Sequence, residues 1–162
     1  MSETKNVQRR TVLKGAAWSV PVVAAAAATP FAAASTINGF SVDGNCGLLG
    51  ALGAGFTVTA GSSPIPAGTQ ITIHSTALVS LNLISLSGQG LAQVSLLGPN
   101  DAVITLTSPI PAGGTMTIQW LLSVSVLTNT TATLTLPAGD TAGPGTKSVG
   151  TLQQTLILCS AG

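Results

Sequence analysis

Charged side chains are scarce in this sequence. Only 6% of its 162 residues are charged, whereas an ordinary soluble protein has about 25%, and five of the charges lie within the first 14 residues. Beyond residue 34 there is no glutamate, arginine or tyrosine, and a formal charge of −2 results from Asp43, Asp101, Asp140 and Lys147. Nucleic-acid-binding surfaces need clustered lysine and arginine, so the sequence predicts no nucleic-acid partner.

Catalytic residue types are equally few. His74 is the one histidine, and a hydrolase triad needs such a base held by a carboxylate. The alternating run 71–74 places His74 on the polar side of a strand, where we expect an exposed surface histidine. Each aspartate stands beside glycine or asparagine, which is typical of turns and not of paired glycosidase carboxylates. The sequence therefore predicts no catalytic residue and favours a protein that is not an enzyme.

Metal and cofactor sites lack their usual ligands. No CxxC or HxxxH spacing occurs, and these are the spacings of common zinc sites. Asp43 with Asn45 offers fewer oxygen atoms than the six to eight that calcium takes. We expect neither a metal site nor a cofactor.

The N-terminal segment carries two adjacent arginines ahead of an alanine-rich apolar run. Arg9 and Arg10 are followed by Thr11, Val12, Leu13 and Lys14. The arrangement resembles the bacterial twin-arginine (Tat) signal peptide, which usually has Phe where Val12 stands and Ser or Thr where Gln8 stands. The resemblance implies a bacterial protein that passes the Tat translocase already folded. An ordinary Sec leader is the alternative.

Small residues end the apolar run. Ala32 and Ala34 fit the subsites of signal peptidase, so we expect cleavage before Ser35, a signal peptide over 1–34 and one domain over 35–162. A retained membrane anchor is the alternative, because the run is nearly long enough to span a bilayer. No lipobox precedes Cys46 and no sorting motif ends the chain. The expected location is therefore extracellular, with the protein released or held non-covalently at the cell surface.

Two cysteines stand near the two ends of the expected domain. In an exported protein, Cys46 and Cys159 suggest one disulfide bond. Free thiols or a metal-binding pair are the alternatives. A disulfide requires the first and last strands to lie close together, as they do in a β-sandwich.

Most of the domain alternates between apolar residues and threonine, serine or glutamine. The pattern is clear over 56–59, 71–74, 115–120 and 131–136, where a period of two indicates half-buried strands. Glycine and proline separate these runs, and no helical period is sustained beyond the leader. The sequence predicts an all-β fold, an antiparallel β-sandwich of seven to nine strands, with a jelly roll or closed barrel as the alternative.

One turn sequence is repeated. Ser63-Pro-Ile-Pro-Ala-Gly-Thr69 recurs as Ser108-Pro-Ile-Pro-Ala-Gly-Gly-Thr115, and Pro137-Ala-Gly139 is a weaker echo. Proline ends strand pairing and Ala-Gly allows a turn with positive φ. Over residues 50–136 this turn, with its following Thr/Ile strand, resembles the immunoglobulin-like domains of bacterial surface and secreted proteins.

Large apolar residues give few hints of a binding surface. Phe56 and Trp120 fall on the apolar side of their strands and are expected in the core. The Gly/Leu run 46–55 is either a flexible loop or a contact surface. Leu96-Leu97 and Leu121-Leu122 break the alternation, which suggests a bulge, a sheet crossing or burial on both sides.

These patterns predict an exported, non-catalytic β-sandwich. Its low charge offers little repulsion between copies, which favours a structural role with self-association or a cell-envelope partner. A ligand- or polysaccharide-binding module is the first alternative. An enzyme, or an inhibitor of an exported enzyme, is the second.

Overall fold

The computed structural model describes residues 35–47, 53–76, 84–120, 127–155 and 158–162. Residues 34–162 form one compact unit, and within the described ranges it contains strands and no helix. A search of these residues accordingly finds no helix that could cross a membrane. The strands are β1 (Thr36–Ile37), β2 (Ser41–Asn45), β3 (Gly55–Thr59), β4 (Gln70–Ser75), β5 (Ile84–Gly88), β6 (Ala92–Leu96), β7 (Asp101–Leu106), β8 (Thr115–Trp120), β9 (Leu127–Thr135), β10 (Thr141–Ala142), β11 (Val149–Thr155) and β12 (Cys159–Ala161).

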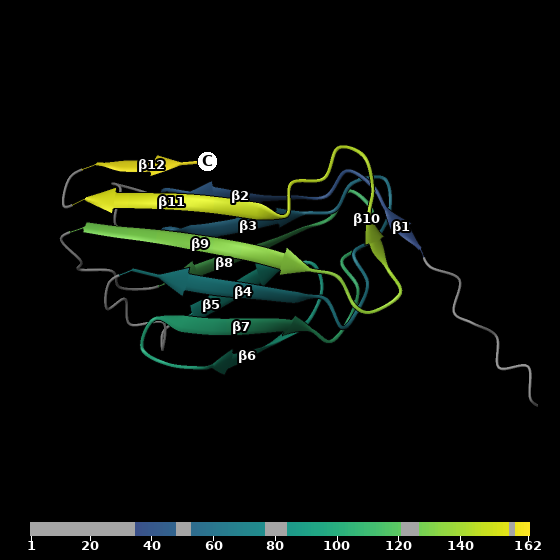
Figure 1. Cartoon of the computed structure of the whole chain (residues 1–162), viewed down its shortest axis with the longest axis horizontal. Helices are drawn as coiled ribbons and strands as arrows, with labels where there is room; N and C mark the ends of the chain where they lie inside the picture. The colour runs from purple at the N-terminus through teal and green to yellow at the C-terminus, as the bar shows by residue number, and fades with distance from the viewer. Residues whose placement is uncertain (1–34, 48–52, 77–83, 121–126, 156–157) are drawn as a thin grey trace, which may run out of the picture. The chain divides into compact units, whose positions relative to one another are not determined.

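Two antiparallel sheets pack face to face (Figure 1). One has the order β2-β3-β8-β5 and the other β12-β11-β9-β4-β7-β6. In the first sheet this is the A-B-E-D order of an immunoglobulin domain, and β11-β9-β4 in the second is its G-F-C order. The immunoglobulin-like sandwich predicted from the sequence is confirmed. The hairpin β6–β7, inserted between strands D and E, and the short β12 bring the two sheets to ten strands, more than the seven to nine predicted from the sequence.

Side chains that alternate along the strands meet between the sheets. The core includes Phe56 and Val58 on β3, Ile71 and Ile73 on β4, Ile104 and Leu106 on β7, and Met116, Ile118 and Trp120 on β8. Phe56 and Trp120 are fully buried, with ring centroids 5.7 Å apart in an edge-on contact. Both aromatic residues therefore lie in the core, as predicted.

The repeated Pro-x-Pro segments are partners of each other. Each joins one sheet to the other, from β3 to β4 and from β7 to β8. Ile65 and Ile110, at the centres of the two copies, exchange backbone hydrogen bonds of 2.9 and 3.0 Å, and both are fully buried. Flanking prolines have no N–H, so pairing stops after one residue and the bridge stays local.

The Ala-Gly part of each repeat forms the same β-turn. Backbone N–H groups of Thr69, Gly114 and Asp140 donate to the carbonyl oxygen of the proline three residues earlier, at 3.4, 2.8 and 3.1 Å. The glycine before each donor has a positive φ, between 71° and 99°, as a type II turn requires at its third position. The repeat is therefore a turn signature, as the sequence predicted.

A disulfide joins Cys46, just after β2, to Cys159 at the start of β12. The two Cα atoms lie 5.7 Å apart. Because β2 is at one edge of the four-stranded sheet and β12 at one edge of the six-stranded sheet, the bond ties the two layers together. The predicted disulfide is confirmed.

Candidate interaction surface

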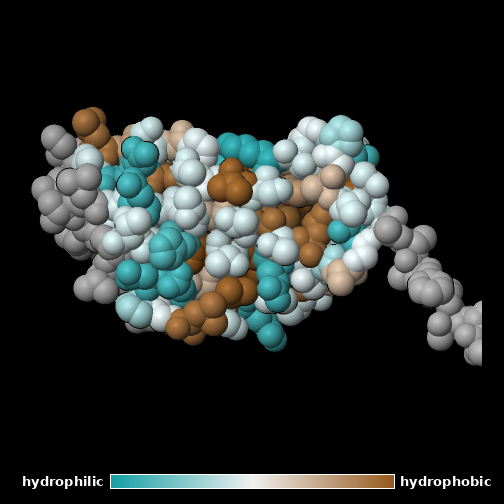
Figure 2. Space-filling view, in the orientation of Figure 1, coloured by the Kyte–Doolittle hydropathy of each residue, from teal (hydrophilic) through white to brown (hydrophobic). Residues whose placement is uncertain are grey.

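Exposed apolar side chains gather on and next to β6, an edge strand of the six-stranded sheet. Four of the six large hydrophobic residues that are exposed in the described ranges belong to this edge: Leu91 is 70% exposed, Val94 38%, Leu96 48% and Leu97 68%. We call these four residues the edge patch. Figure 2 shows hydrophobic side chains along the lower margin of the molecule, where Figure 1 places β6. Contiguous exposed apolar side chains of this kind mark interaction sites.

Val94 and Leu96 of the edge patch are exposed because the larger sheet extends past the smaller one. Val94 pairs with Ile104 and Leu96 with Ala102 on β7, so directly opposed residues share the inner face of the sheet. Ile104 and Ala102 are fully buried. The opposing four-stranded sheet ends at β5 and does not extend over β6, the strand beyond β7.

The backbone of β6 is open along its outer side. Leu97 N–H donates to Asp101 O at 3.0 Å, and Thr107 N–H donates to Leu91 O at 2.7 Å. Hydrogen-bonding direction alternates along an antiparallel strand, so the odd-numbered residues of β6 bond to β7. The N–H and C=O groups of the even-numbered residues point outward, and among the described residues β6 pairs with β7 alone.

Two other described edge strands, β2 and β12, are protected in ways that β6 is not. Along β2, Val42 N–H donates to Lys147 O and Lys147 N–H donates to Phe40 O, at 2.9 and 2.8 Å. The strand at the other edge of the six-stranded sheet, β12, has only three residues, and one of them forms the disulfide. Native edges usually carry a lysine, a proline or a bulge that prevents further pairing, and residues 91–97 include no charge and no proline.

Sequence reasoning found only part of this surface. Leu96 and Leu97 were expected at a bulge, a sheet crossing or a position buried on both sides, and each of these interpretations is wrong for this pair. Both are exposed, at the end of an edge strand. Leu121 and Leu122 lie outside the described residues. An uncharged apolar run between Gly90 and Gly98-Pro99 was the available signal.

The run 46–55 is divided between the core and the part of the chain that is not described. Ala54 and Gly55 are buried at the start of β3, whereas residues 48–52 lie outside the described ranges. The C-terminal end of this run therefore belongs to the core, whereas Gly47 near its N-terminal end is exposed.

His74 is exposed on the outer face of the six-stranded sheet, as predicted, and has a carboxylate partner. Its Nδ1 donates to Asp101 Oδ1 at 2.6 Å, across the β4–β7 pair. Asp101 was expected in a turn but is the first residue of β7, because the turn of this hairpin is formed by residues 97–100. An oriented imidazole resembles the base of a hydrolase, yet no hydrogen bond to its Nε2 occurs in the described part of the chain. Exposed pairs of this type contribute under about 1 kcal/mol.

Asp43 forms a second exposed pair. Lys147 Nζ donates to Asp43 Oδ1 at 2.7 Å. This hydrogen bond, together with one from Ser41, lowers the pKa of Asp43 below its usual value. Asp43 was expected in a turn, and that prediction is wrong: it lies in β2, opposite Thr57, because Gly44 continues the strand. Asp140, in contrast, lies in the predicted turn.

The oxygen atoms weighed for calcium already have partners. Asn45 Oδ1 accepts a hydrogen bond from Gly47 N–H at 3.0 Å, and Asp43 Oδ1 accepts one from Lys147. Within the described residues no three His, Cys, Asp or Glu side chains are close enough together to hold a metal ion.

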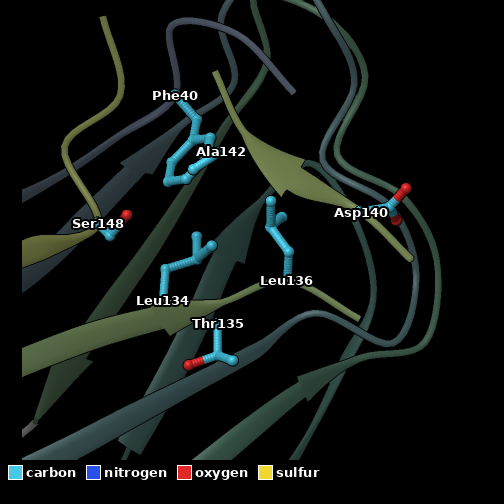
Figure 3. Close-up of a pocket in the computed structure, with 7 residues that line it drawn as sticks. All are labelled: Phe40, Leu134, Thr135, Leu136, Asp140, Ala142 and Ser148. Atoms are coloured by element: carbon cyan, nitrogen blue, oxygen red, sulfur yellow. The ribbon is translucent and has the colours of Figure 1, made fainter. Parts of the chain in front are cut away.

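A shallow hollow lies between β9 and β10 (Figure 3). It has a volume of about 290 Å³ and is lined by Phe40, Leu134, Thr135, Leu136, Asp140, Ala142 and Ser148. Phe40 and Leu134 form an apolar floor, and Figure 3 shows the Asp140 carboxylate turned away from them. Ligand pockets usually measure 300–1,000 Å³ with several convergent polar groups, and this hollow lies at the lower limit of that range.

The expected signal residues stand mostly beyond the described chain. Arg9, Arg10, Leu13, Lys14, Ala32 and Ala34 all lie outside the described residues. Ser35, the expected first residue after cleavage, is exposed, and its carbonyl oxygen accepts a hydrogen bond from Thr141 N–H at 2.9 Å. The disulfide itself is consistent with an oxidising compartment. No family model, curated protein or solved structure matches this chain.

Proposed function

We propose that the protein is exported through the Tat route, loses residues 1–34, and acts outside the cell as a non-catalytic β-sandwich. In this proposal it works by association, with further copies of itself or with a cell-envelope component. The arginine pair in the leader supports the route, and the disulfide supports an oxidising destination.

The edge patch is the observation that carries the proposed role. It combines exposed leucine and valine side chains with outward-facing backbone groups on a strand without charge. A binding partner gains both apolar contact and strand pairing there, which is the usual basis of β-strand addition.

Binding of polysaccharide has less support. Sugar platforms generally use exposed aromatic rings, and the aromatic residues after residue 34 are Phe40, Phe56 and Trp120. All three are fully buried. A glycan would have to bind through hydrogen bonds to polar side chains, without an aromatic ring to stack on.

The test combines export with association. The full gene is expressed in a Tat-competent bacterium beside an Arg9→Lys/Arg10→Lys variant, and the medium is analysed by intact mass with and without reductant. We expect wild-type protein that begins at Ser35 with one disulfide, and retention of the variant inside the cell. The exported protein is then sized by light scattering and incubated with cell-envelope fragments. A strict monomer at high concentration that binds no envelope material would contradict the proposed role.

A further inference from the structure

The open edge of β6 is complementary to itself. Residues 91–97 read Leu-Ala-Gln-Val-Ser-Leu-Leu. When a second copy of this run is placed antiparallel and centred on Val94, apolar residues face apolar ones and polar residues face polar ones. Leu91 then meets Leu97, Ala92 meets Leu96, and Gln93 meets Ser95, with Val94 meeting its own equivalent.

The backbone selects the same register. The outward N–H and C=O groups belong to Ala92, Val94 and Leu96, and directly opposed residues of this kind exchange two hydrogen bonds in an antiparallel pair. With Val94 at the centre, the three residues of each copy face the same three of the other and form about six hydrogen bonds. If the twofold axis is placed at Gln93 or Ser95 instead, one of the three residues with outward backbone groups lies opposite a residue outside the partner's β6 strand. Such a placement also puts a leucine opposite a polar residue.

Side-chain faces are also matched in this register. Ala92, Val94 and Leu96 share the inner face with the buried residues of β7, whereas Gln93 and Ser95 lie on the outer face. Each copy therefore continues both the apolar and the polar face of the other. Charge does not oppose the contact, because residues 91–97 carry none.

We propose that two copies of this chain pair antiparallel through β6, about a twofold axis at Val94, and join their six-stranded sheets into one continuous sheet. The proposal rests on the proposed function in one respect, since it takes self-association as the mode of action. It identifies the partner as a second copy, and the contact as an isologous one in which each edge protects the other.

Sedimentation of matched variants tests the interface. Both the full chain and residues 35–162 are used, because all described strands lie between Thr36 and Ala161. We expect wild type to reach twice the mass of one chain as its concentration rises. Val94→Lys places two ammonium groups at the axis and should raise the dissociation constant about 100-fold. Gln93→Lys adds the same charge to the outer face of the same strand and should change it by no more than about threefold.

Disulfide trapping tests the register. Opposed hydrogen-bonded residues have Cα atoms about 5.5 Å apart, which is within the range that a disulfide spans. Val94→Cys should therefore give a reducible covalent dimer, whereas Ser87→Cys, exposed on β5, should not. A thermal melt shows whether Val94→Lys is folded. If it is not, disulfide trapping at Val94 still tests the β6 interface.

The outcomes separate this inference from the proposed function. Dimers that withstand Val94→Lys and resist trapping at Val94 would overturn the β6 interface while self-association stands. A monomer that binds envelope fragments would also overturn it, with the proposed role intact. A monomer that binds nothing would overturn both.

Discussion

An added methyl group at Gly113 would lie in open space, so backbone conformation alone sets the cost of a substitution there. Gly113 has a φ of +71° with no atom within 4 Å of an ideal Cβ, and Gly98 is equally open but has no positive φ. We expect Gly113→Ala to lower the free energy of unfolding by about 1–2 kcal/mol. Gly98→Ala should change it by no more than about 0.5 kcal/mol. Urea unfolding of the two variants beside wild type measures the difference.

An equal loss in the two variants would show that the turn is not strained by a side chain. Gly113→Asn provides a further check, because asparagine adopts the left-handed conformation more readily than alanine. It should recover part of the loss.

Single residues were predictable where their role is local. The positive φ of the turn glycines and the burial of Phe56 and Trp120 follow from short-range pattern, as the structure confirms. The ion pairs of Asp43 and Asp101 do not follow from short-range pattern, because their partners Lys147 and His74 are 104 and 27 residues away in the sequence. Only the strand register brings these groups together.

At the level of elements, the two Pro-x-Pro connections act as one unit. Ile65 and Ile110 are fully buried and share both hydrogen bonds of the bridge. We expect Ile65→Ala and Ile110→Ala each to cost about 2–5 kcal/mol of unfolding free energy. Because each truncation loosens the site of the other, the double variant should depart from additivity by about 0.5–3 kcal/mol.

A double-mutant cycle by chemical denaturation measures that coupling. The matched control is Ile65→Ala with Leu152→Ala, since Leu152 lies on β11 and shares no hydrogen bond with Ile65. The control pair should be additive within about 0.5 kcal/mol. Coupling of the same size in both pairs would mean that the bridge is not a distinct unit.

The strands themselves were easier to predict than which strands lie beside or opposite them. Alternation marked β3, β4, β8 and β9, and the all-β fold followed from it. The exposure of β6 depends on where the opposing sheet ends, and no property of residues 91–97 taken alone contains that fact. For this reason the candidate surface emerged only from the structure.

For the whole molecule, the disulfide closes a loop between residues 113 positions apart. Such a bond restricts the unfolded chain, and its loss from small domains typically costs about 2–5 kcal/mol. We expect Cys46→Ser/Cys159→Ser to unfold at a correspondingly lower urea concentration and temperature. Wild type held in reductant should behave like the double variant. If reductant destabilises wild type but the variant matches the oxidised protein, the effect is not due to this bond.

The position of the disulfide also decides how the molecule responds to mechanical tension. If one end of residues 35–162 is held at a surface and the other is pulled, force passes from residues 35–45 through the Cys46–Cys159 bond and out through residues 160–162. Residues between the cysteines are shielded, so the strands from β3 to β11 cannot be drawn out while the bond is intact. Only residues 35–45 and 160–162 can extend, which at about 3.3–3.6 Å per residue amounts to about 50 Å of slack. The domain is thus a nearly inextensible link under load.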